Sequence, residues 1–104
     1  MKDIWFGLVH VEPQNNKYEI LDGAKGAYVN VLALASSKDE YVKIITKALE
    51  DYEFIVHSVE DVNLLSYLQQ NGREFDSEIL QLVDHLSENY PVQFDEFQSY
   101  EEGE

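Results

Sequence analysis

The chain has 104 residues, of which 44% are hydrophobic, so it has the length and apolar content of one globular domain. It contains no cysteine, which excludes a disulfide framework and a thiolate metal site. Its formal net charge of -14 repels phosphate groups, so direct binding to nucleic acid or to an anionic membrane is disfavoured and a basic protein partner is favoured.

Two apolar segments near the N-terminus predict strands. Residues 4–11 are almost all apolar until Glu12 and Pro13 interrupt the pattern, so we expect a central strand that is covered on both faces. Residues 14–26 have the turn-forming composition of a surface loop. Residues 27–35 repeat the apolar pattern and predict a second buried strand.

The next segment predicts a helix followed by a strand. Ser37 and Glu40 are spaced as in a capping box, where the serine hydroxyl accepts from the amide of Glu40 and the glutamate reaches back. Apolar residues then recur every three or four positions up to Tyr52, which indicates a helix with one buried face. Residues 53–59 predict a third strand. A strand, a helix and a strand in this order favour a right-handed crossover between parallel strands.

Two more helices are expected in the second half of the chain. Asp61 is placed to cap a short helix that ends near Gly72. Asp76 is placed to cap a longer helix that ends before Pro91. Residues 92–100 predict either an edge strand or an arm that docks its aromatic side chains.

Together these elements predict an α+β fold. The expected order is strand, strand, helix, strand, helix, helix, with a possible further strand at the C-terminal end. We expect a mixed sheet of three to four strands, with the helices packed mainly on one face. One domain is expected to span residues 1–100, and residues 101–104 are expected to form a disordered acidic tail.

The acidic residues are unevenly distributed along the chain. Residues 1–50 contain six lysines against seven acidic residues, whereas residues 51–104 contain Arg73 alone against fourteen. Carboxylates among aromatic residues suit a basic protein surface, because the charges steer encounter and the rings supply dry contact area. The alternative is that the acids only keep the protein soluble while the aromatics complete the core. The residues expected to contact a partner are Asp84, Glu88, Asp95, Glu96, Tyr100, Glu101 and Glu102.

The histidines are the candidate transition-metal ligands. His10 ends the first predicted strand and His57 lies in the third, so the two would meet, with Glu12 nearby, if these strands pair. Their spacing matches no zinc motif, and a plainer interpretation is that His57 is partly buried and satisfied by its neighbours. We therefore predict no metal and no cofactor. A small metal-binding or enzymatic domain that uses His10 and His57 is the alternative.

No catalytic motif is present in the sequence. Neighbouring acidic residues such as Glu60 and Asp61 point in different directions on a strand or helix, so they cannot clasp one substrate together. No serine lies in a G-x-S-x-G turn. We therefore expect that the protein is not an enzyme.

The N-terminal residues run directly into the first apolar segment, without the apolar core and cleavage site of a signal peptide. No apolar stretch approaches the roughly 20 residues that a membrane helix requires. With the absence of cysteine, these features predict a cytoplasmic protein. The oligomeric state is open, although a sheet edge at the first strand would allow a second copy to pair.

Two segments carry a resemblance to a known group of proteins. They are Trp5–Pro13 (WFGLVHVEP) and Gly26–Ser36 (GAYVNVLALAS), the latter including Tyr28-Val29-Asn30, and a helix rich in acids and lysines follows them. This pattern resembles small acidic bacterial proteins, some of which are immunity partners of toxin systems. The resemblance covers about the first half of the chain and carries no catalytic residues. It implies a cytoplasmic protein that blocks a cognate toxin by one-to-one binding.

Charge and resemblance together predict a protein inhibitor. Its most concrete form is an immunity protein whose acidic surface covers the basic cleft of a nuclease-like toxin. The alternative is a phage-type inhibitor that mimics nucleic acid, such as an anti-CRISPR protein. The two hypotheses require the same charge and differ in the partner.

Overall fold

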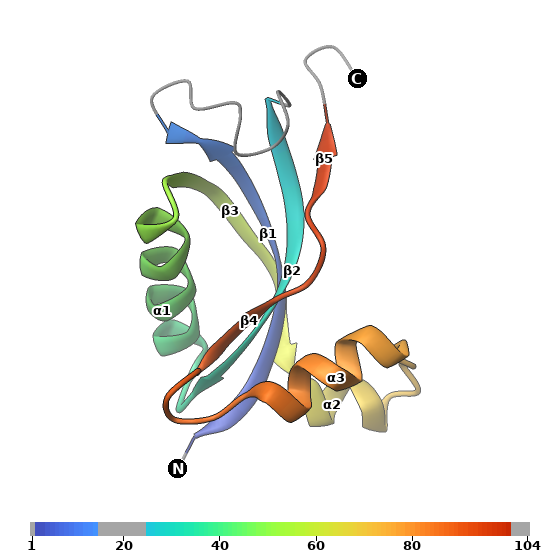
Figure 1. The fold of residues 1–104 in the computed structure, drawn as a ribbon. Helices are drawn as coiled ribbons and strands as arrows, with labels where there is room; N and C mark the ends of the chain where they lie inside the picture. The colour runs from blue at the N-terminus through green and yellow to red at the C-terminus, as the bar shows by residue number, and fades with distance from the viewer. Residues whose placement is uncertain (1, 15–24, 101–104) are drawn as a thin grey trace.

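The computed structural model describes residues 2–14 and 25–100. Its central element is an antiparallel sheet (Figure 1). The strands are β1 (Asp3–Pro13), β2 (Gly26–Ala35), β3 (Phe54–Leu64), β4 (Val92–Phe94) and β5 (Gln98–Tyr100). The helices are α1 (Lys38–Asp51), α2 (Leu65–Gln70) and α3 (Ser77–His85). The strands lie in the order β3-β1-β2-β4, and β5 also pairs with β2. The predicted α+β class and order of elements are confirmed.

Strand β1 lies inside the sheet, as its apolar sequence predicts. It pairs with β2 on one side and with β3 on the other, so that Val9 is the partner of both Val29 and Val59. Because β1 has a neighbour on each side, it offers no free edge to a second copy of the chain.

The sheet differs from the expected mixed sheet, because every strand pair within the described residues is antiparallel. Strands β2 and β3 both run antiparallel to β1 and are therefore parallel to each other, as the predicted crossover requires. They do not pair, however, since β1 lies between them. Helix α1 carries the chain from one side of β1 to the other.

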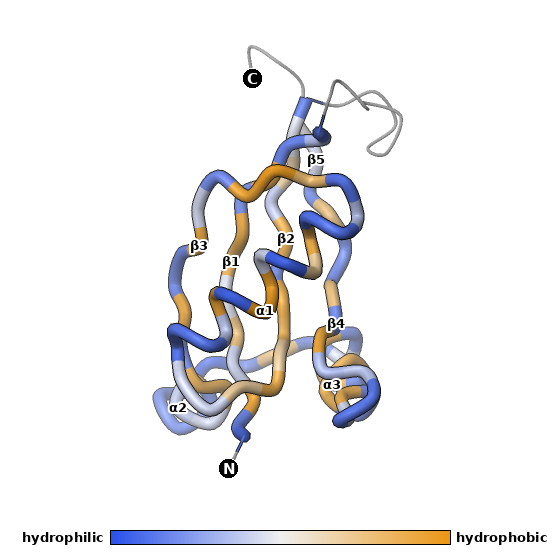
Figure 2. The backbone as a smooth tube through the Cα atoms, turned by 90° about the vertical axis from the view of Figure 1, so that its left-hand side faces the viewer, coloured by the Kyte–Doolittle hydropathy of each residue, from blue (hydrophilic) through white to orange (hydrophobic). Residues whose placement is uncertain are grey.

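Helix α1 covers one face of the sheet and forms the larger part of the core with it. Buried side chains at odd-numbered positions of β1 and β2, such as Val9 and Val31, pack against Tyr41, Ile45 and Leu49 of α1. Figure 2 shows hydrophobic residues along the strands behind this helix. The Tyr41 hydroxyl donates a hydrogen bond to the carbonyl of Val31 at 2.7 Å, so the buried polar group is satisfied.

Helices α2 and α3 pack at one end of the opposite face. There Phe6 and Leu32, at even-numbered positions, form a second cluster with Leu65 of α2 and Ile79 of α3. The expectation that the helices pack mainly on one face is thus wrong for α2 and α3. The physical reason is that β1 and β2 are apolar on both faces at this end, so each face needs its own cover.

Two of the three predicted helix caps are present. The Ser37 hydroxyl accepts from the amide of Glu40 at 3.1 Å, and Asp76 accepts from the amide of Ile79 at 3.0 Å. Asp61 caps no helix, because it lies inside β3 with a φ of 54°. Helix α2 begins later, at Leu65, without a side-chain cap.

The ends of some elements differ from the prediction. Strand β3 continues to Leu64 and not to residue 59, because its pairing with β1 resumes after two irregularities in the register. Helix α3 ends at His85, and a turn closed by Ser87 and Tyr90 follows it. The predicted tail, residues 101–104, lies outside the described residues.

Most of the predicted loop, residues 15–24, also lies outside the described part of the chain. Within residues 2–14 and 25–100, no helix has both the length and the apolar content needed to cross a membrane.

Candidate functional site

The face of the sheet opposite α1 is only half covered by helices. Phe6 and Leu32 lie under α2 and α3, but the other half presents even-numbered residues that remain accessible. The side chains of Glu12 and His57 are 44% and 40% exposed, and Tyr28 is 40% exposed. Such accessible polar and aromatic side chains on a rigid sheet are candidates for binding.

Three rings form a row across this open half of the sheet. His57 of β3, His10 of β1 and Tyr28 of β2 lie on adjacent strands (Figure 1). His10 stacks on Tyr28 with ring centroids 4.6 Å apart and planes 17° apart. The His57 ring lies 5.1 Å from that of His10 and is tilted by 41°.

A bulge in β3 places His57 in the row. His10 is paired with Ser58 and Val11 with Val56, so His57 is an extra residue that has no partner of its own in the ladder. The side chain of a bulge residue points in a different direction from the one that the regular alternation of the strand would give it. Here the bulge brings the His57 ring beside His10.

A carboxylate lies at one end of the row. The Glu12 Oε2 atom is 3.1 Å from the His57 Nε2 atom, which is an ion pair when the imidazole is protonated. Both side chains are exposed, so the pair adds little to the stability of the fold. We call His10, Glu12, Tyr28 and His57 the sheet-face platform.

The platform does not resemble a metal centre. His10, His57 and Glu12 lie together, as the metal-binding hypothesis required. Nevertheless, no group of three or more His, Cys, Asp or Glu side chains within residues 2–14 and 25–100 is arranged to hold a metal ion. The His10 ring stacks on Tyr28, and the His57 imidazole lies tilted beside His10 and pairs with Glu12. His85 lies away from them, in the last turn of α3.

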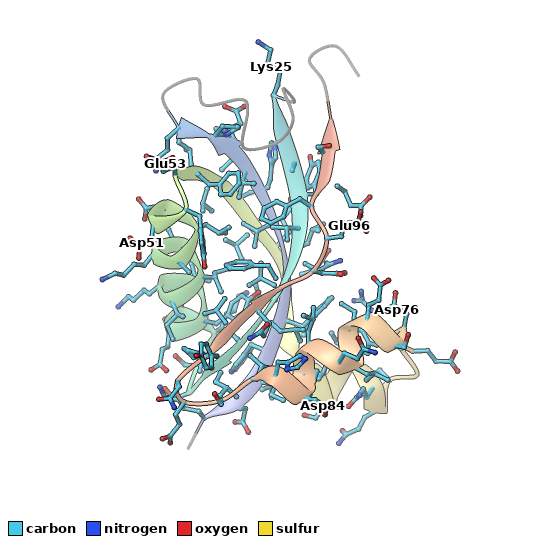
Figure 3. All side chains as sticks on the ribbon, viewed as in Figure 1. Lys25, Asp51, Glu53, Asp76, Asp84 and Glu96 are labelled. Carbon is cyan, nitrogen blue, oxygen red and sulfur yellow. The ribbon has the colours of Figure 1, made fainter. Side chains whose placement is uncertain are left out.

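The predicted C-terminal contact residues come from several separate elements. Asp84 is exposed on α3, Glu88 is exposed in the turn after it, and Asp95 and Glu96 lie between β4 and β5. Figure 3 shows Asp84 on α3 and Glu96 beside the middle of the sheet, at separate places on the molecule. Tyr100 belongs to β5, but Glu101 and Glu102 lie outside the described residues.

The aromatic residues of the C-terminal segment divide into two kinds. Phe94 and Phe97 are half-buried and pack against the main core, where Phe97 stacks on Phe54 with centroids 5.3 Å apart. Tyr90 is 68% exposed and lines an apolar groove of about 450 Å³ that also includes Tyr52 and Pro91. The phenylalanines therefore complete the core, as the alternative interpretation supposed.

Acidic residues lie on both sides of the sheet, but on the α1 side they are accompanied by lysines, since α1 also carries Asp39, Glu40, Glu50 and Asp51. Lys38, Lys43 and Lys47 all belong to α1. Figure 3 shows Asp76, Asp84 and Glu96 on the side away from that helix, although Asp51 and Glu53 lie near its C-terminal end. Glu60 is the partner of Leu8 and therefore faces the same side as Glu12. The acidic surface thus extends beyond the predicted C-terminal residues.

Arg73, the single cation of the second half of the chain, lies on an aromatic pair. Its guanidinium carbon is 4.9 Å from the ring centroid of Phe6 and 5.0 Å from that of Phe75. This geometry is a cation–π contact, and it covers the buried Phe6 ring on the face opposite α1.

Tyr28 is the residue of the platform that sequence reasoning missed, because it was assigned to a strand with two buried faces. The signal was present in the alternation: Tyr28 and Asn30 are the more polar residues between Ala27, Val29 and Val31.

Comparison of the chain with family models, with curated proteins and with solved structures finds no match.

Proposed function

We propose that the chain acts by binding and not by catalysis: it recognises a basic protein in the cytoplasm and blocks it, as an immunity protein neutralises a nuclease-like toxin. The observation that carries the proposal is the scarcity of cations beside the carboxylates on the side of the sheet away from α1. Carboxylates such as Glu60, Asp84 and Glu96 occupy the side of the sheet away from the α1 lysines. The net charge of -14 gives the molecule as a whole a strong negative potential.

A negative surface suits a nuclease-like partner for a physical reason. Enzymes that act on nucleic acid hold the phosphate backbone with clustered lysine and arginine side chains. A carboxylate surface on a rigid sheet can occupy such a cleft, and opposite charges accelerate the encounter. The same charge repels nucleic acid and anionic membranes, so a protein is the proposed target.

Two experiments test the proposal: capture of the partner protein and measurement of the rate at which it associates with the chain. The intact chain is immobilised and exposed to lysate of the cells that produce it, at about 50 mM and about 500 mM NaCl. We expect a protein rich in lysine and arginine to be retained at the lower salt concentration and largely lost at the higher one. The activity of the captured protein is then measured with and without the chain, and we expect inhibition at one-to-one stoichiometry.

A matched pair of variants locates the surface. One variant carries Glu60→Gln, Asp84→Asn and Glu96→Gln. The control carries Asp39→Asn, Glu50→Gln and Asp51→Asn on α1, and so changes the net charge by the same amount. We expect the first variant to associate about tenfold more slowly at low salt and the control to change less. A partner without basic character, or an association rate indifferent to salt, would contradict the proposal.

A further inference from the structure

We propose that an apolar groove beside α2 and α3 receives an aliphatic side chain of the basic partner, next to a lysine or arginine of that partner. This inference rests on the proposed function and names the apolar contact that a charged surface alone does not supply. The groove has a volume of about 510 Å³ and lies at the end of the sheet where β1 begins. Its lining is mostly apolar and comes from β1, β2, α2 and α3, with Lys2 at its edge.

The floor of the groove is a pair of neighbouring side chains on the sheet. Ile4 of β1 is the partner of Leu34 of β2, one same-face position beyond the pair Phe6 and Leu32. Phe6 and Leu32 are buried under the helices, whereas Ile4 and Leu34 are only half-buried. The sheet therefore extends past the helices that cover this face, and the outer apolar pair keeps an accessible surface.

The two helices line the groove beside this floor. Helix α3 contributes Leu80 and Val83, and α2 contributes Leu65 and Gln69. Leu80 is 44% exposed although its neighbour Ile79 is buried, so it lies at the border of the apolar stripe of α3. An aliphatic side chain that enters the groove would contact apolar atoms on several sides, as the anchor residues of protein interfaces do.

The charge beside the groove selects the partner. Asp84 lies one helical turn after Leu80 on α3, so its carboxylate is next to the rim of the groove (Figure 3). Within the described part of the chain this carboxylate has no ion-pair or hydrogen-bond partner. The charged residues that line the groove, Lys2 and Asp3, have opposite signs and offset each other. A cation beside the anchoring side chain is therefore attracted to Asp84, whereas an acidic segment is repelled by it and by the net charge of -14.

The groove and the carboxylates act at different stages of binding. Charges act over a distance and mainly set the rate of association, whereas apolar contacts form only after docking and mainly set the rate of dissociation. With the captured partner, we expect Leu80→Gln to raise the dissociation rate about fivefold and to change the association rate by less than about twofold. An unchanged dissociation rate would overturn the inference.

Synthetic peptides probe the groove of the intact chain by calorimetry at about 50 mM NaCl. The probes are the basic apolar peptide KLLKKLLK, the basic polar peptide KSSKKSSK and the acidic apolar peptide ELLEELLE, all acetylated and amidated at their ends. We expect KLLKKLLK to bind about fivefold more tightly than either of the others. It should shift the NMR amide signals of Leu65 and Leu80 but not those of α1.

Two variants distinguish insertion into the groove from adhesion to apolar surface in general. Leu80→Gln removes apolar lining, and Ser66→Phe adds a ring at a position that also lines the groove. Both residues are exposed, so neither change opens the core. We expect each variant to bind KLLKKLLK about fivefold more weakly. A surface that is only adhesive would bind the peptide more tightly after Ser66→Phe, because that change adds apolar area.

Control variants change matched groups elsewhere. Ile55 of β3 is 43% exposed, so Ile55→Gln removes an aliphatic side chain as accessible as Leu80. Glu78 lies two residues before Leu80 and so points to the other side of α3, which makes Glu78→Gln the control for Asp84→Asn. We expect Asp84→Asn to weaken KLLKKLLK binding about threefold, and each control to change it by less than about twofold. The fluorescence of the half-buried Trp5 reports that the variants remain folded.

The possible results separate the two proposals. Equal binding of KLLKKLLK and KSSKKSSK, or equal losses in groove and control variants, would overturn the groove but leave an acidic binding surface intact. Absence of KLLKKLLK binding, or equally tight binding of ELLEELLE, would also overturn the inference. Groove-dependent binding of KLLKKLLK without capture of any basic protein would support the groove and count against the proposed function.

Discussion

Gly7 is a position at which a single methyl group would disturb the main core. A Cβ atom built on it would lie 2.8 Å from the Tyr41 hydroxyl and 3.1 Å from a methyl group of Val62. Both neighbours are buried and belong to the α1 side of the sheet. Burial also raises the pKa of Tyr41, so its hydroxyl stays protonated and continues to donate to Val31.

We therefore expect Gly7→Ala to lower the free energy of unfolding by about 1–3 kcal/mol. Tyr41→Phe removes both the hydroxyl and its hydrogen bond, and should cost about 0.5–1.5 kcal/mol. Because the second change also removes the closest clash, the double variant should lose less than the sum of the two. Urea unfolding of all four proteins measures this coupling. Strict additivity would mean that the new methyl group does not press on the Tyr41 hydroxyl.

At the scale of elements, the start of α1 is held by a local network of hydrogen bonds. The Ser37 hydroxyl caps the helix, as predicted. The Glu40 carboxylate, however, contacts Ser36, the residue before the cap, and not Ser37 itself. It accepts from the hydroxyl and the amide of Ser36, at 2.8 and 3.1 Å. The Ser36 hydroxyl, followed by its amide, lowers the pKa of Glu40 below 4.5.

This lowered pKa gives a pH dependence with a definite sign. The carboxylate of Glu40 stabilises the folded state fully above its unfolded pKa, near 4.5, and this contribution is lost as the pH falls through the lower folded value. We expect Glu40→Gln to destabilise the protein at pH 7, with the difference from wild type shrinking below pH 4.5. Thermal unfolding at several pH values measures it. Asp39→Asn is the control, and an identical profile for both variants would mean that charge alone matters.

The elements were predictable where the sequence signal is local. Ser37 and Asp76 mark their helices because a side-chain cap depends on neighbours a few residues away. The extent of β3 was not predictable, because it depends on pairing with a distant strand. Asp61 has the sequence of a cap, yet the ladder with β1 continues past it to Leu64. The antiparallel arrangement likewise depends on how distant strands meet.

The candidate site was predictable only in part. Strand pairing brings His10 and His57 together with Glu12, as the sequence suggested, but the bulge that aims His57 leaves no local signal. The predicted acidic patch assumed that residues close in sequence stay close in space. Instead, Asp84 and Glu96 come from different elements at separate places.

At the scale of the whole molecule, repulsion among carboxylates opposes the compact state. With a net charge of -14, added salt should screen this repulsion and stabilise the fold. We expect the melting temperature to rise by a few degrees between about 20 mM and about 500 mM NaCl. The variant with Glu60, Asp84 and Glu96 neutralised should show a smaller rise. A melting temperature that falls with salt would indicate that ion pairs, and not repulsion, dominate the surface electrostatics.

The irregular pairing of β3 affects how the protein behaves at high concentration. This strand is the outer one on its side of the described sheet, and it is interrupted at two points, beside His57 and at Asp61. An incoming chain that tried to extend the sheet there would find amides and carbonyls out of step and the Glu60 and Asp61 carboxylates in its path. The protein should therefore stay dispersed at concentrations at which a straight, uncharged border would seed fibrils.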